Sequence, residues 1–396
     1  MGFAEAVIDL EALGANCRAV RGLLRPGVAL LAVVKANAYG HGGIEVSRAL
    51  VAAGAEALGV AYVEEGILLR RAGLRVPILV MGPTSPEAAE AVLDQGLAPM
   101  VSDLAFAERL SSLAAQAGRT VGVHLKVDTG MGRLGVSPEE APAYAAKLAR
   151  LPGIRLEGFM SHFADADAEE PTLAREQLAR FLAVDRALRA SGLSAGRRHL
   201  ANSAGVLALP EAHLDLVRPG ILLYGYAPSA RLAARLALCP ALTLRTRIAA
   251  LRVVPRGQGV SYGHTFVAPQ DVRVATIPVG YADGVRRSLS NRGEVLVRGR
   301  RAPILGRICM DMTLVDVSAT PEAALGDEVV LIGRQGKEAI TADDVAAAAG
   351  TISYEVLAGI GPRIPRAYVG GAAPAGKEAA RPPEATGSRR ERRGAP

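Results

Sequence analysis

The feature that most constrains the fold is a repeated order of segments between residues 30 and 220. Short apolar runs alternate there with longer amphipathic segments that have helical spacing. Alternation of strands and helices predicts a parallel sheet, and eight such units predict a (β/α)8 TIM barrel rather than an open sheet. The predicted strand runs are 30–36, 56–61, 77–82, 98–103, 121–129, 155–163, 197–204 and 214–220.

The pattern changes after about residue 235. Strand-like segments such as ALTLRTRIAALRVV and GEVLVRG follow one another, separated by Gly or Pro turns, which predicts a mainly β domain. We therefore expect an α/β chain with a barrel domain over 1–235 and a β-rich domain over 236–370. Residues 371–396 are rich in Pro, Gly and charge, and we expect a disordered basic tail.

Composition argues against several classes of protein. No apolar run reaches the ~18 residues that a membrane-spanning helix needs, and the first residues lack the basic start of a secretory signal. Cys17, Cys239 and Cys309 form neither a disulfide framework nor a zinc spacing. We expect a cytoplasmic protein without a membrane partner.

Nucleic-acid binding and metal binding are also disfavoured. The chain has no Trp, and its RRERR cluster lies in the tail, where a solvated segment is the simpler interpretation. HFADAD (162–167) has carboxylates at metal-like spacing, but no other residues complete a site. We expect no nucleic-acid partner and assign no metal.

Polar residues gather where the predicted strands end. A Lys at the end of an apolar run, such as Lys35, could simply mark the surface, because Lys is almost never fully buried without a partner. Other strand ends, however, also carry polar groups, and barrel active sites are built from the C-terminal ends of strands. These groups are Tyr39, Lys126, Arg133, His162, Asn202, Ser203 and Arg218.

The chemistry of these groups points to a cofactor. The hydroxyls of Tyr39 and Ser203 and the backbone N–H groups of Gly220 and Ile221 suit a phosphate near the last strands. A Lys such as Lys35, at the mouth of a desolvating barrel, can lose its proton and attack a carbonyl carbon. A Lys beside a phosphate cradle indicates pyridoxal 5'-phosphate bound as a Schiff base.

Nine segments together resemble the successive signature segments of the alanine racemases, which are pyridoxal-phosphate-dependent enzymes of fold type III. The resemblance runs in order from about residue 6 to residue 370. Several matches in the right order are specific, whereas one would be weak. The segments are VVKANAYGHG, KVDTGMGRLG, SHFA, ANSAG, VRPGILLYG, GVSYGHTF, VGYADG, RICMDM and TISYEVL.

The resemblance implies an isomerase that interconverts L-alanine and D-alanine and supplies D-alanine for peptidoglycan. Lys35 would hold the cofactor and act as the base for the D-isomer. Tyr262 would be the opposite base, for the L-isomer, and in this family the partner subunit supplies that tyrosine. We therefore expect a homodimer with shared active sites.

The resemblance also implies the remaining roles. Arg218 would face the pyridine nitrogen of the cofactor, with support from His162, and Arg133 and the backbone of Met310 would bind the substrate carboxylate. Lys126 matches a lysine that many members carry as a carbamate, which orients the arginine. The other expected cofactor-binding residues are Tyr39, Asn202, Ser203, Gly220, Ile221 and Tyr354.

Racemisation needs a proton acceptor on each face of the α-carbon, which a Lys and a Tyr can supply. An Arg at the pyridine nitrogen is informative, because guanidinium does not give up its proton and leaves that nitrogen unprotonated. The ring is then a weaker electron sink, so reprotonation at the α-carbon is favoured over transamination.

Three other functions compete with this interpretation. A barrel decarboxylase of amino acids would pair the ring nitrogen with an acid, whereas this chain has Arg218 in VRPG. A cofactor-carrier protein would lack the β domain and any equivalent of Tyr262. An exported broad-specificity or serine racemase would carry a signal segment and paired cysteines. The preference for alanine over serine stays open.

Overall fold

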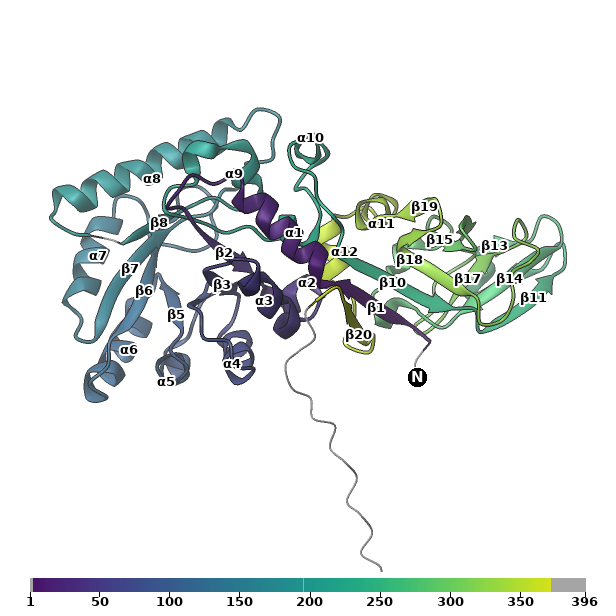
Figure 1. The fold of residues 1–396 in the computed structure, drawn as a ribbon, viewed down its shortest axis with the longest axis horizontal. Helices are drawn as coiled ribbons and strands as arrows, with labels where there is room; N and C mark the ends of the chain where they lie inside the picture. Colours follow the sequence, from purple (N-terminus) through teal and green to yellow (C-terminus); the bar gives the residue numbers. More distant parts are fainter. Residues whose placement is uncertain (1–2, 195, 372–396) are drawn as a thin grey trace, which may run out of the picture.

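The computed structural model describes residues 3–194 and 196–371. Figure 1 shows two parts side by side, a barrel with surrounding helices on the left and an elongated β-rich part on the right. Nearly all of the predicted tail, from residue 372 onward, lies outside the described residues.

The barrel consists of eight strands in the order β8-β7-β6-β5-β4-β3-β2-β9, and all of their pairings are parallel. The two end strands meet through backbone hydrogen bonds from Arg218 to Ala201 (2.9 Å) and from Asp215 to Arg198 (3.1 Å). The prediction of a (β/α)8 barrel is confirmed. The strands are β2 (Ala29–Val33), β3 (Ala57–Val60), β4 (Ile78–Val80), β5 (Ala98–Val101), β6 (Val121–Lys126), β7 (Ile154–Met160), β8 (Arg197–His199) and β9 (Leu216–Val217).

Helices cover the outside of the barrel (Figure 1). Local sequence explains where several of them begin, because Asp9, Asp103 and Asn202 each accept a hydrogen bond from the backbone of the first helical turn. The helices are α1 (Leu10–Arg21), α3 (Gly43–Ala52), α4 (Val63–Arg71), α5 (Ala89–Asp94), α6 (Leu104–Gln116), α7 (Ala141–Arg150), α8 (Thr172–Ala190) and α9 (Ser203–Ala208).

The first helix of the chain fills the last position around the barrel. After β9 the chain forms only a 3-10 segment, η3 (Ile221–Tyr224), and a short helix, α10 (Ala230–Ala233). Helix α1 packs against η3 on one side and α3 on the other. A helix that precedes β2 therefore covers the junction between the last and first strands.

The β-rich part is built on a sheet with the strand order β16-β15-β18-β10-β1-β20, and β19 pairs with β18. Its strand β1 (Glu5–Asp9) comes from the start of the chain and lies between β10 and β20. The expected division at residue 235 stays a prediction. That division did not foresee that β1, which belongs to the residues expected in the barrel domain, joins the sheet of the β-rich part. The other members are β10 (Leu242–Arg247), β15 (Glu294–Val297), β16 (Arg300–Pro303), β18 (Glu328–Gln335), β19 (Glu338–Ile340) and β20 (Arg366–Val369).

Two smaller sheets and two helices complete this part. The sheets have the orders β11-β14-β17 and β12-β13. Helix α12 packs against α2, the short turn that follows β2. The elements of this part are β11 (Ala250–Val254), β12 (Gly259–Val260), β13 (Phe266–Val267), β14 (Val272–Ile277), β17 (Thr313–Asp316), α11 (Ala342–Ala349) and α12 (Ser353–Ala358), whereas α2 (Lys35–Tyr39) belongs to the barrel.

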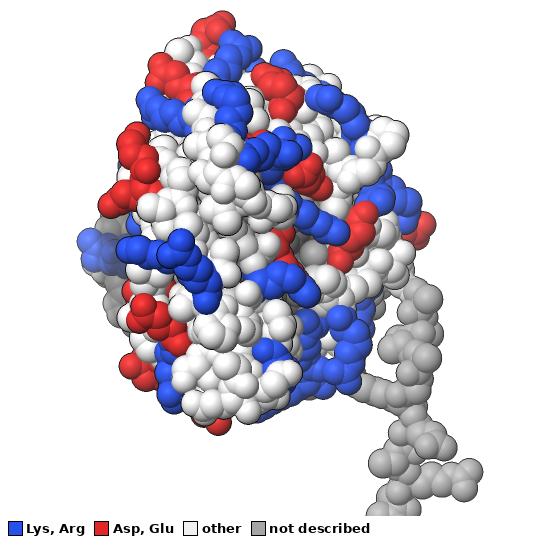
Figure 2. Space-filling view, turned by 90° about the vertical axis from the view of Figure 1, so that its left-hand side faces the viewer, with Lys and Arg blue, Asp and Glu red and all other residues white. Residues whose placement is uncertain are grey.

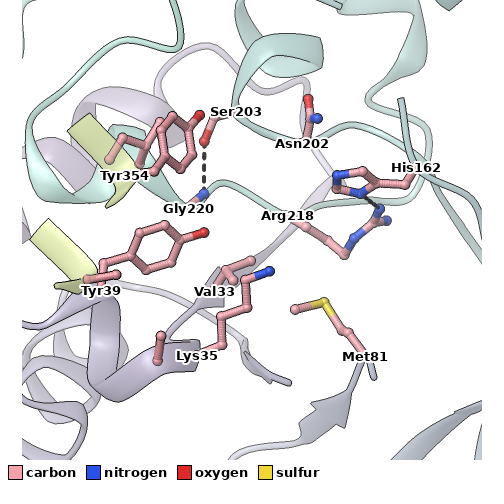
Figure 3. A pocket seen from close by; sticks show the side chains of 13 residues that line it. Val33, Lys35, Tyr39, Met81, His162, Asn202, Ser203, Arg218, Gly220 and Tyr354 are labelled. Atoms are coloured by element: carbon pink, nitrogen blue, oxygen red, sulfur yellow. Dashed lines mark hydrogen bonds between the residues drawn. The ribbon is translucent and has the colours of Figure 1, made fainter. Parts of the chain in front are cut away.

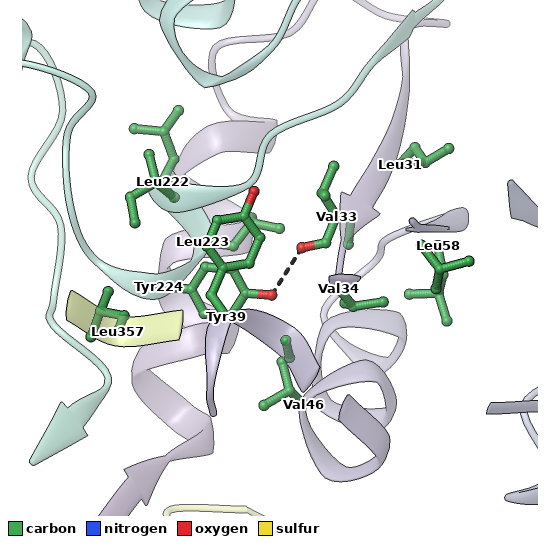
Figure 4. Packing of buried hydrophobic residues seen from close by; sticks show 14 of the residues in the cluster. Leu31, Val33, Val34, Tyr39, Val46, Leu58, Leu222, Leu223, Tyr224 and Leu357 are labelled. Carbon is green, nitrogen blue, oxygen red and sulfur yellow. Dashed lines mark hydrogen bonds between the residues drawn. The ribbon is translucent and has the colours of Figure 1, made fainter. Parts of the chain in front are cut away.

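One hydrophobic core runs from the barrel into the β-rich part. At the junction, Leu357 of α12 lies beside Tyr39 and Tyr224, and the Tyr224 hydroxyl donates to the Val33 carbonyl (2.9 Å; Figure 4). This packing fixes the end of β2 against the second part of the molecule.

The outer face of the barrel shows Lys and Arg interspersed with Asp and Glu (Figure 2). Charges of both signs on one face are typical of a solvated surface. Among the described helices, none combines the length and apolar character needed to cross a membrane.

Candidate active site

A cavity of about 340 Å³ opens at the C-terminal ends of the barrel strands (Figure 3). The nine residues predicted to bind the cofactor all line it, although their roles remain predictions. Its apolar walls were not foreseen, because Val33, Ala36, Met81 and Ala358 carry no chemical signal in the sequence. The predicted residues that line it are Lys35, Tyr39, His162, Asn202, Ser203, Arg218, Gly220, Ile221 and Tyr354.

The chain takes an unusual path just after β2. Ala36, Asn37, Ala38 and Tyr39 all have φ between 52° and 54°, which makes one turn of left-handed helix directly after Lys35. Each L-residue in this conformation costs about 1–2 kcal/mol. Surrounding contacts must offset this strain, so the direction of the chain around Lys35 is imposed by the rest of the fold.

The Lys35 side chain points into the cavity (Figure 3). Burial lowers the pKa of its amine, and the positive charges of Arg133 and Arg218 lower it further, against an opposing effect of Glu65. A lowered pKa increases the neutral fraction of the amine, which is the form that attacks a carbonyl carbon.

Hydroxyls and a backbone N–H meet on the opposite side of the cavity. The Gly220 N–H donates to Ser203 Oγ (2.8 Å; Figure 3). A Cβ at Gly220 would lie 2.4 Å from Tyr39 Oη, so only glycine allows this close approach. Tyr39 stacks on Tyr224 with ring centroids 4.7 Å apart, and burial raises the pKa of Tyr39 and of Tyr354. Both phenols therefore remain hydrogen-bond donors at neutral pH.

Arg218 is buried and has only neutral partners among the described residues. Its guanidinium donates to the Ser161 carbonyl (2.7 Å), to His199 Nδ1 (2.9 Å) and, at 3.4 Å, to His162 Nδ1. Burial lowers its pKa to about 9. A buried cation without a carboxylate is expensive, so the site favours a ligand group that accepts its hydrogen bonds.

A histidine pair extends this network behind the cavity. His199 Nδ1 accepts from Arg218, which can only donate, so the proton of the neutral His199 ring lies on Nε2. His199 Nε2 then donates to His124 Nδ1 (2.7 Å). Burial and the charge of Arg218 lower the pKa of both rings, that of His124 to about 4. Sequence reasoning missed this pair because both histidines lie inside predicted strand runs, 121–129 and 197–204, and not at their predicted ends.

Lys126 lies at the end of β6 and is only 4% exposed. Burial, followed by the positive charge of Arg218, lowers the pKa of its amine to about 7. Its Nζ donates to the Val127 carbonyl (3.3 Å). A large fraction of this amine is therefore neutral near pH 7, which carbamate formation requires.

Arg133 lies on the loop that follows β6. Asp128 organises this loop, since its carboxylate accepts from the backbone N–H groups of Gly130 (2.9 Å), Met131 (2.8 Å) and Arg133 (3.1 Å). The Arg133 charge acts on the Lys35 amine, but the side chain does not line the cavity.

Tyr262 and Met310 do not reach the cavity of their own chain. Tyr262 is 70% exposed and Met310 is 52% exposed, and both belong to the β-rich part. If these two residues take part in a site, that site lies on a second chain that covers them.

The residues present fit pyridoxal phosphate. A neutralisable amine, a polar cradle too narrow for a Cβ and a buried guanidinium without an acid lie around one cavity. The amine suits an aldehyde carbon, the cradle suits a phosphate, and the guanidinium suits an aromatic nitrogen that lacks a proton and can accept its hydrogen bond.

Comparisons with known proteins identify the family of the chain. Sequence models described as "Alanine racemase, N-terminal domain" and "Alanine racemase, C-terminal domain" match residues 8–228 and 241–368. The alanine racemase of Desulfovibrio desulfuricans is 47% identical over 364 residues, which cover 92% of this chain and 97% of that protein.

Solved structures show the same fold. An alanine racemase from Streptomyces lavendulae superposes with a TM-score of 0.89 at 41% identity, covering 94% of this chain and 98% of the other. One from Bartonella henselae, described with covalently bound pyridoxal phosphate, has a TM-score of 0.83 at 31% identity, covering 93% and 100%. This chain belongs to the alanine racemase family of isomerases.

Proposed function

We propose that this protein interconverts L-alanine and D-alanine with pyridoxal 5'-phosphate as cofactor and supplies D-alanine for peptidoglycan synthesis in the cytoplasm. The observation that carries the proposal is the placement of Lys35 and Arg218 around one cavity, with no carboxylate among its lining residues. When bound, the cofactor withdraws electrons from the α-carbon of an amino acid and makes its hydrogen acidic.

The described residues would hold this cofactor from three sides. Lys35 would bind its aldehyde carbon, while Ser203, Tyr39, Tyr354 and the backbone of Gly220 and Ile221 would bind the phosphate, with Asn202 supporting the loop. Arg218 would donate to the ring nitrogen and thereby keep it unprotonated. His162 and the His199–His124 pair would hold the guanidinium in place.

Two bases would move the proton. The lowered pKa of Lys35 allows its amine to accept the α-hydrogen of the D-isomer and to return a proton to the same face. Tyr262 of the partner subunit would act on the opposite face, for the L-isomer. Arg133 and the backbone of the partner subunit's Met310 would bind the substrate carboxylate.

A homodimer with shared sites accounts for the exposure of the second base. Large apolar side chains are exposed on the same part of the molecule as Tyr262 and at the residue just before α12. Burial of such side chains drives association of subunits. They include Tyr262, Tyr281, Met310, Met312 and Ile352.

We also propose that Lys126 carries a carbamate that orients Arg133. Its neutral amine would add to carbon dioxide and release one proton, and the resulting anion would offset the positive charges of Arg133 and Arg218. Protein in buffer with ¹³C-labelled bicarbonate should show a carbamate carbon signal by NMR. Lys126→Met should lose that signal, and an unchanged signal would exclude this residue as its source.

The overall function is tested by giving the purified protein, with pyridoxal phosphate, L-alanine, L-serine or L-lysine in separate reactions. Chiral chromatography should show D-alanine from L-alanine, and no carbon dioxide should be released. Lys35→Ala should abolish both turnover and the visible absorption of the bound cofactor. Release of carbon dioxide without a D-isomer would instead support a decarboxylase.

A further inference from the structure

One carboxylate outside the cavity holds the left-handed turn that carries Lys35. Glu65 lies in the first turn of α4, and its Oε1 accepts from the Ala36 N–H at 2.6 Å. Its Oε2 accepts from the N–H groups of Ala61 (2.7 Å) and Tyr62 (3.3 Å). A single side chain thus joins the loops that follow two neighbouring barrel strands.

Helix capping explains only half of this arrangement. A glutamate at the third helical position commonly reaches back to the N-terminal cap, here Tyr62, with one oxygen. The second oxygen of Glu65 serves a different strand, at the residue that follows Lys35. Ala36 begins the left-handed turn, and Glu65 is the hydrogen-bond acceptor of its N–H.

Two further contacts hold the later part of the turn. Asn37 Oδ1 accepts from the Gly43 N–H at 2.7 Å, and His41 Nδ1 lies 2.9 Å from the Tyr39 carbonyl. Both of these contacts come from within residues 37–43. Of these three hydrogen bonds, only that to Glu65 joins the turn to another element of the barrel, while the last residue of the turn, Tyr39, also stacks on Tyr224 of η3.

Glu65 also opposes the positive charge around the Lys35 amine. The charges of Arg133 and Arg218 disfavour the protonated amine, and the charge of Glu65 favours it. Apart from Arg218, the titratable side chains that line the cavity with Lys35 are Tyr39, His162 and Tyr354, which are neutral near pH 7 because of their burial.

We propose that Glu65 is a positioning residue, which fixes the left-handed turn at Ala36 and so aims the Lys35 amine into the cavity. This inference rests on the proposed function, because it is the attack of Lys35 on an aldehyde that the turn would serve. Glutamate is suited to this position because it offers two acceptor oxygens. A glutamine has one, and cannot accept from both loops.

The test measures covalent attachment of pyridoxal phosphate to the full-length protein after its bound cofactor has been removed. In this step the neutral Lys35 amine adds to the aldehyde carbon and one water molecule leaves. Attachment is followed by absorption, and borohydride reduction with mass spectrometry places it on Lys35. Glu65→Gln and Glu65→Ala are expected to slow it about tenfold or more, as for the loss of a hydrogen bond to a charged group.

Glu64→Gln is the matched control, because Glu64 is the exposed neighbour on the same turn of α4 and its replacement removes the same charge. It should attach the cofactor at the wild-type rate. Glu65→Asp keeps the charge with a shorter reach and should fall between wild type and Glu65→Ala.

Two additional readouts separate positioning from general loss of structure. The pH at which attachment reaches half its maximal rate should fall in Glu65→Gln, because removal of a nearby negative charge lowers the pKa of Lys35, and it should be restored in Glu65→Asp. Hydrogen exchange at the Ala36 amide of the cofactor-free protein should be faster in Glu65→Gln than in Glu64→Gln. The exchange measurement also applies if Glu65→Ala fails to fold.

The outcomes distinguish the inference from the function on which it rests. If the wild-type protein does not attach the cofactor at Lys35, the proposed function is wrong. If the wild type attaches it and Glu65→Gln behaves like Glu64→Gln in rate, pH midpoint and exchange, Glu65 does not position Lys35.

Discussion

Buried basic side chains give the site its electrostatic character. Lys126 and Arg218 are 4% and 3% exposed, and the charge of Arg218 is one cause of the lowered pKa of Lys126. Asp128 opposes this shift but does not compensate for burial. Protonation of Lys126 therefore costs free energy in the folded protein but not in the unfolded chain, so it lowers the free energy of unfolding.

This difference predicts a pH dependence of stability. Lys126 loses its proton near pH 7 in the folded protein and near pH 10.5 in the unfolded chain. Between these values the unfolded state binds more protons, so the Lys126 contribution to stability rises with pH by up to roughly 1.4 kcal/mol per pH unit. As the pH falls to 7 this contribution is lost, and below pH 7 it no longer changes.

Urea unfolding of wild type and Lys126→Met at pH 6, 7, 8 and 9, in carbonate-free buffer, measures this effect. The free energy of unfolding of wild type minus that of the variant should be level up to about pH 7 and should increase above it. Lys147→Met, at an exposed Lys of α7, is the control and should give a difference that is independent of pH. A level difference for Lys126→Met as well would contradict the lowered pKa of Lys126.

Among the elements, the barrel strands could be predicted from the sequence, but the left-handed turn after β2 could not. Each of the eight predicted apolar runs overlaps a barrel strand. The segment KANAY contains no glycine that would predict a left-handed conformation. The first glycine after it is Gly40. Contacts with other elements, such as that of Glu65 with Ala36, are needed to impose this conformation.

The conformation of the turn predicts an unusual tolerance of glycine. Ala36→Gly should relieve roughly 1 kcal/mol of strain, against about 0.5–1 kcal/mol lost to the greater freedom of the unfolded chain. Its stability should therefore change little. Ala183→Gly, at an exposed position in the middle of the right-handed helix α8, should lose about 1 kcal/mol.

Urea unfolding of both variants checks this prediction in one experiment. Equal losses of stability in Ala36→Gly and Ala183→Gly would mean that the left-handed turn is not strained. Retention of the cofactor by Ala36→Gly would show further that the turn keeps its path.

The placement of β1 was beyond sequence reasoning for a different reason. EAVID has the alternation of a strand, but alternation does not say which strand it pairs with. Its partners lie far along the chain, with Glu5 opposite Arg245 and Ala6 opposite Arg366. Such pairing is decided by the packing of the whole molecule.

For the molecule as a whole, the proposed second base, Tyr262, does not lie beside Lys35 in the described chain. Tyr262 does not line the cavity, and its exposure of 70% leaves it free to reach a second copy. Under the proposed two-base mechanism with shared sites, each site would need Lys35 from one subunit and Tyr262 from the other.

Mixing two inactive variants tests this arrangement. In a mixed dimer of Lys35→Ala and Tyr262→Phe, one site has lost both bases and the other has both. Random exchange of subunits makes half of the dimers mixed, so roughly a quarter of wild-type activity should return. Continued inactivity, with mixed dimers demonstrated by mass spectrometry, would contradict shared sites.

The sequence by itself determined the barrel, the mainly β part and the polar groups at the strand ends. These depend on local periodicity and on the rule that the C-terminal ends of parallel strands meet, which brings residues such as Lys35 and Arg218 to one cavity. Only the tertiary structure decided the left-handed turn, the Arg218–His199–His124 network and the position of β1. Each of these depends on contacts between residues distant in the chain, whose free energies no local pattern encodes.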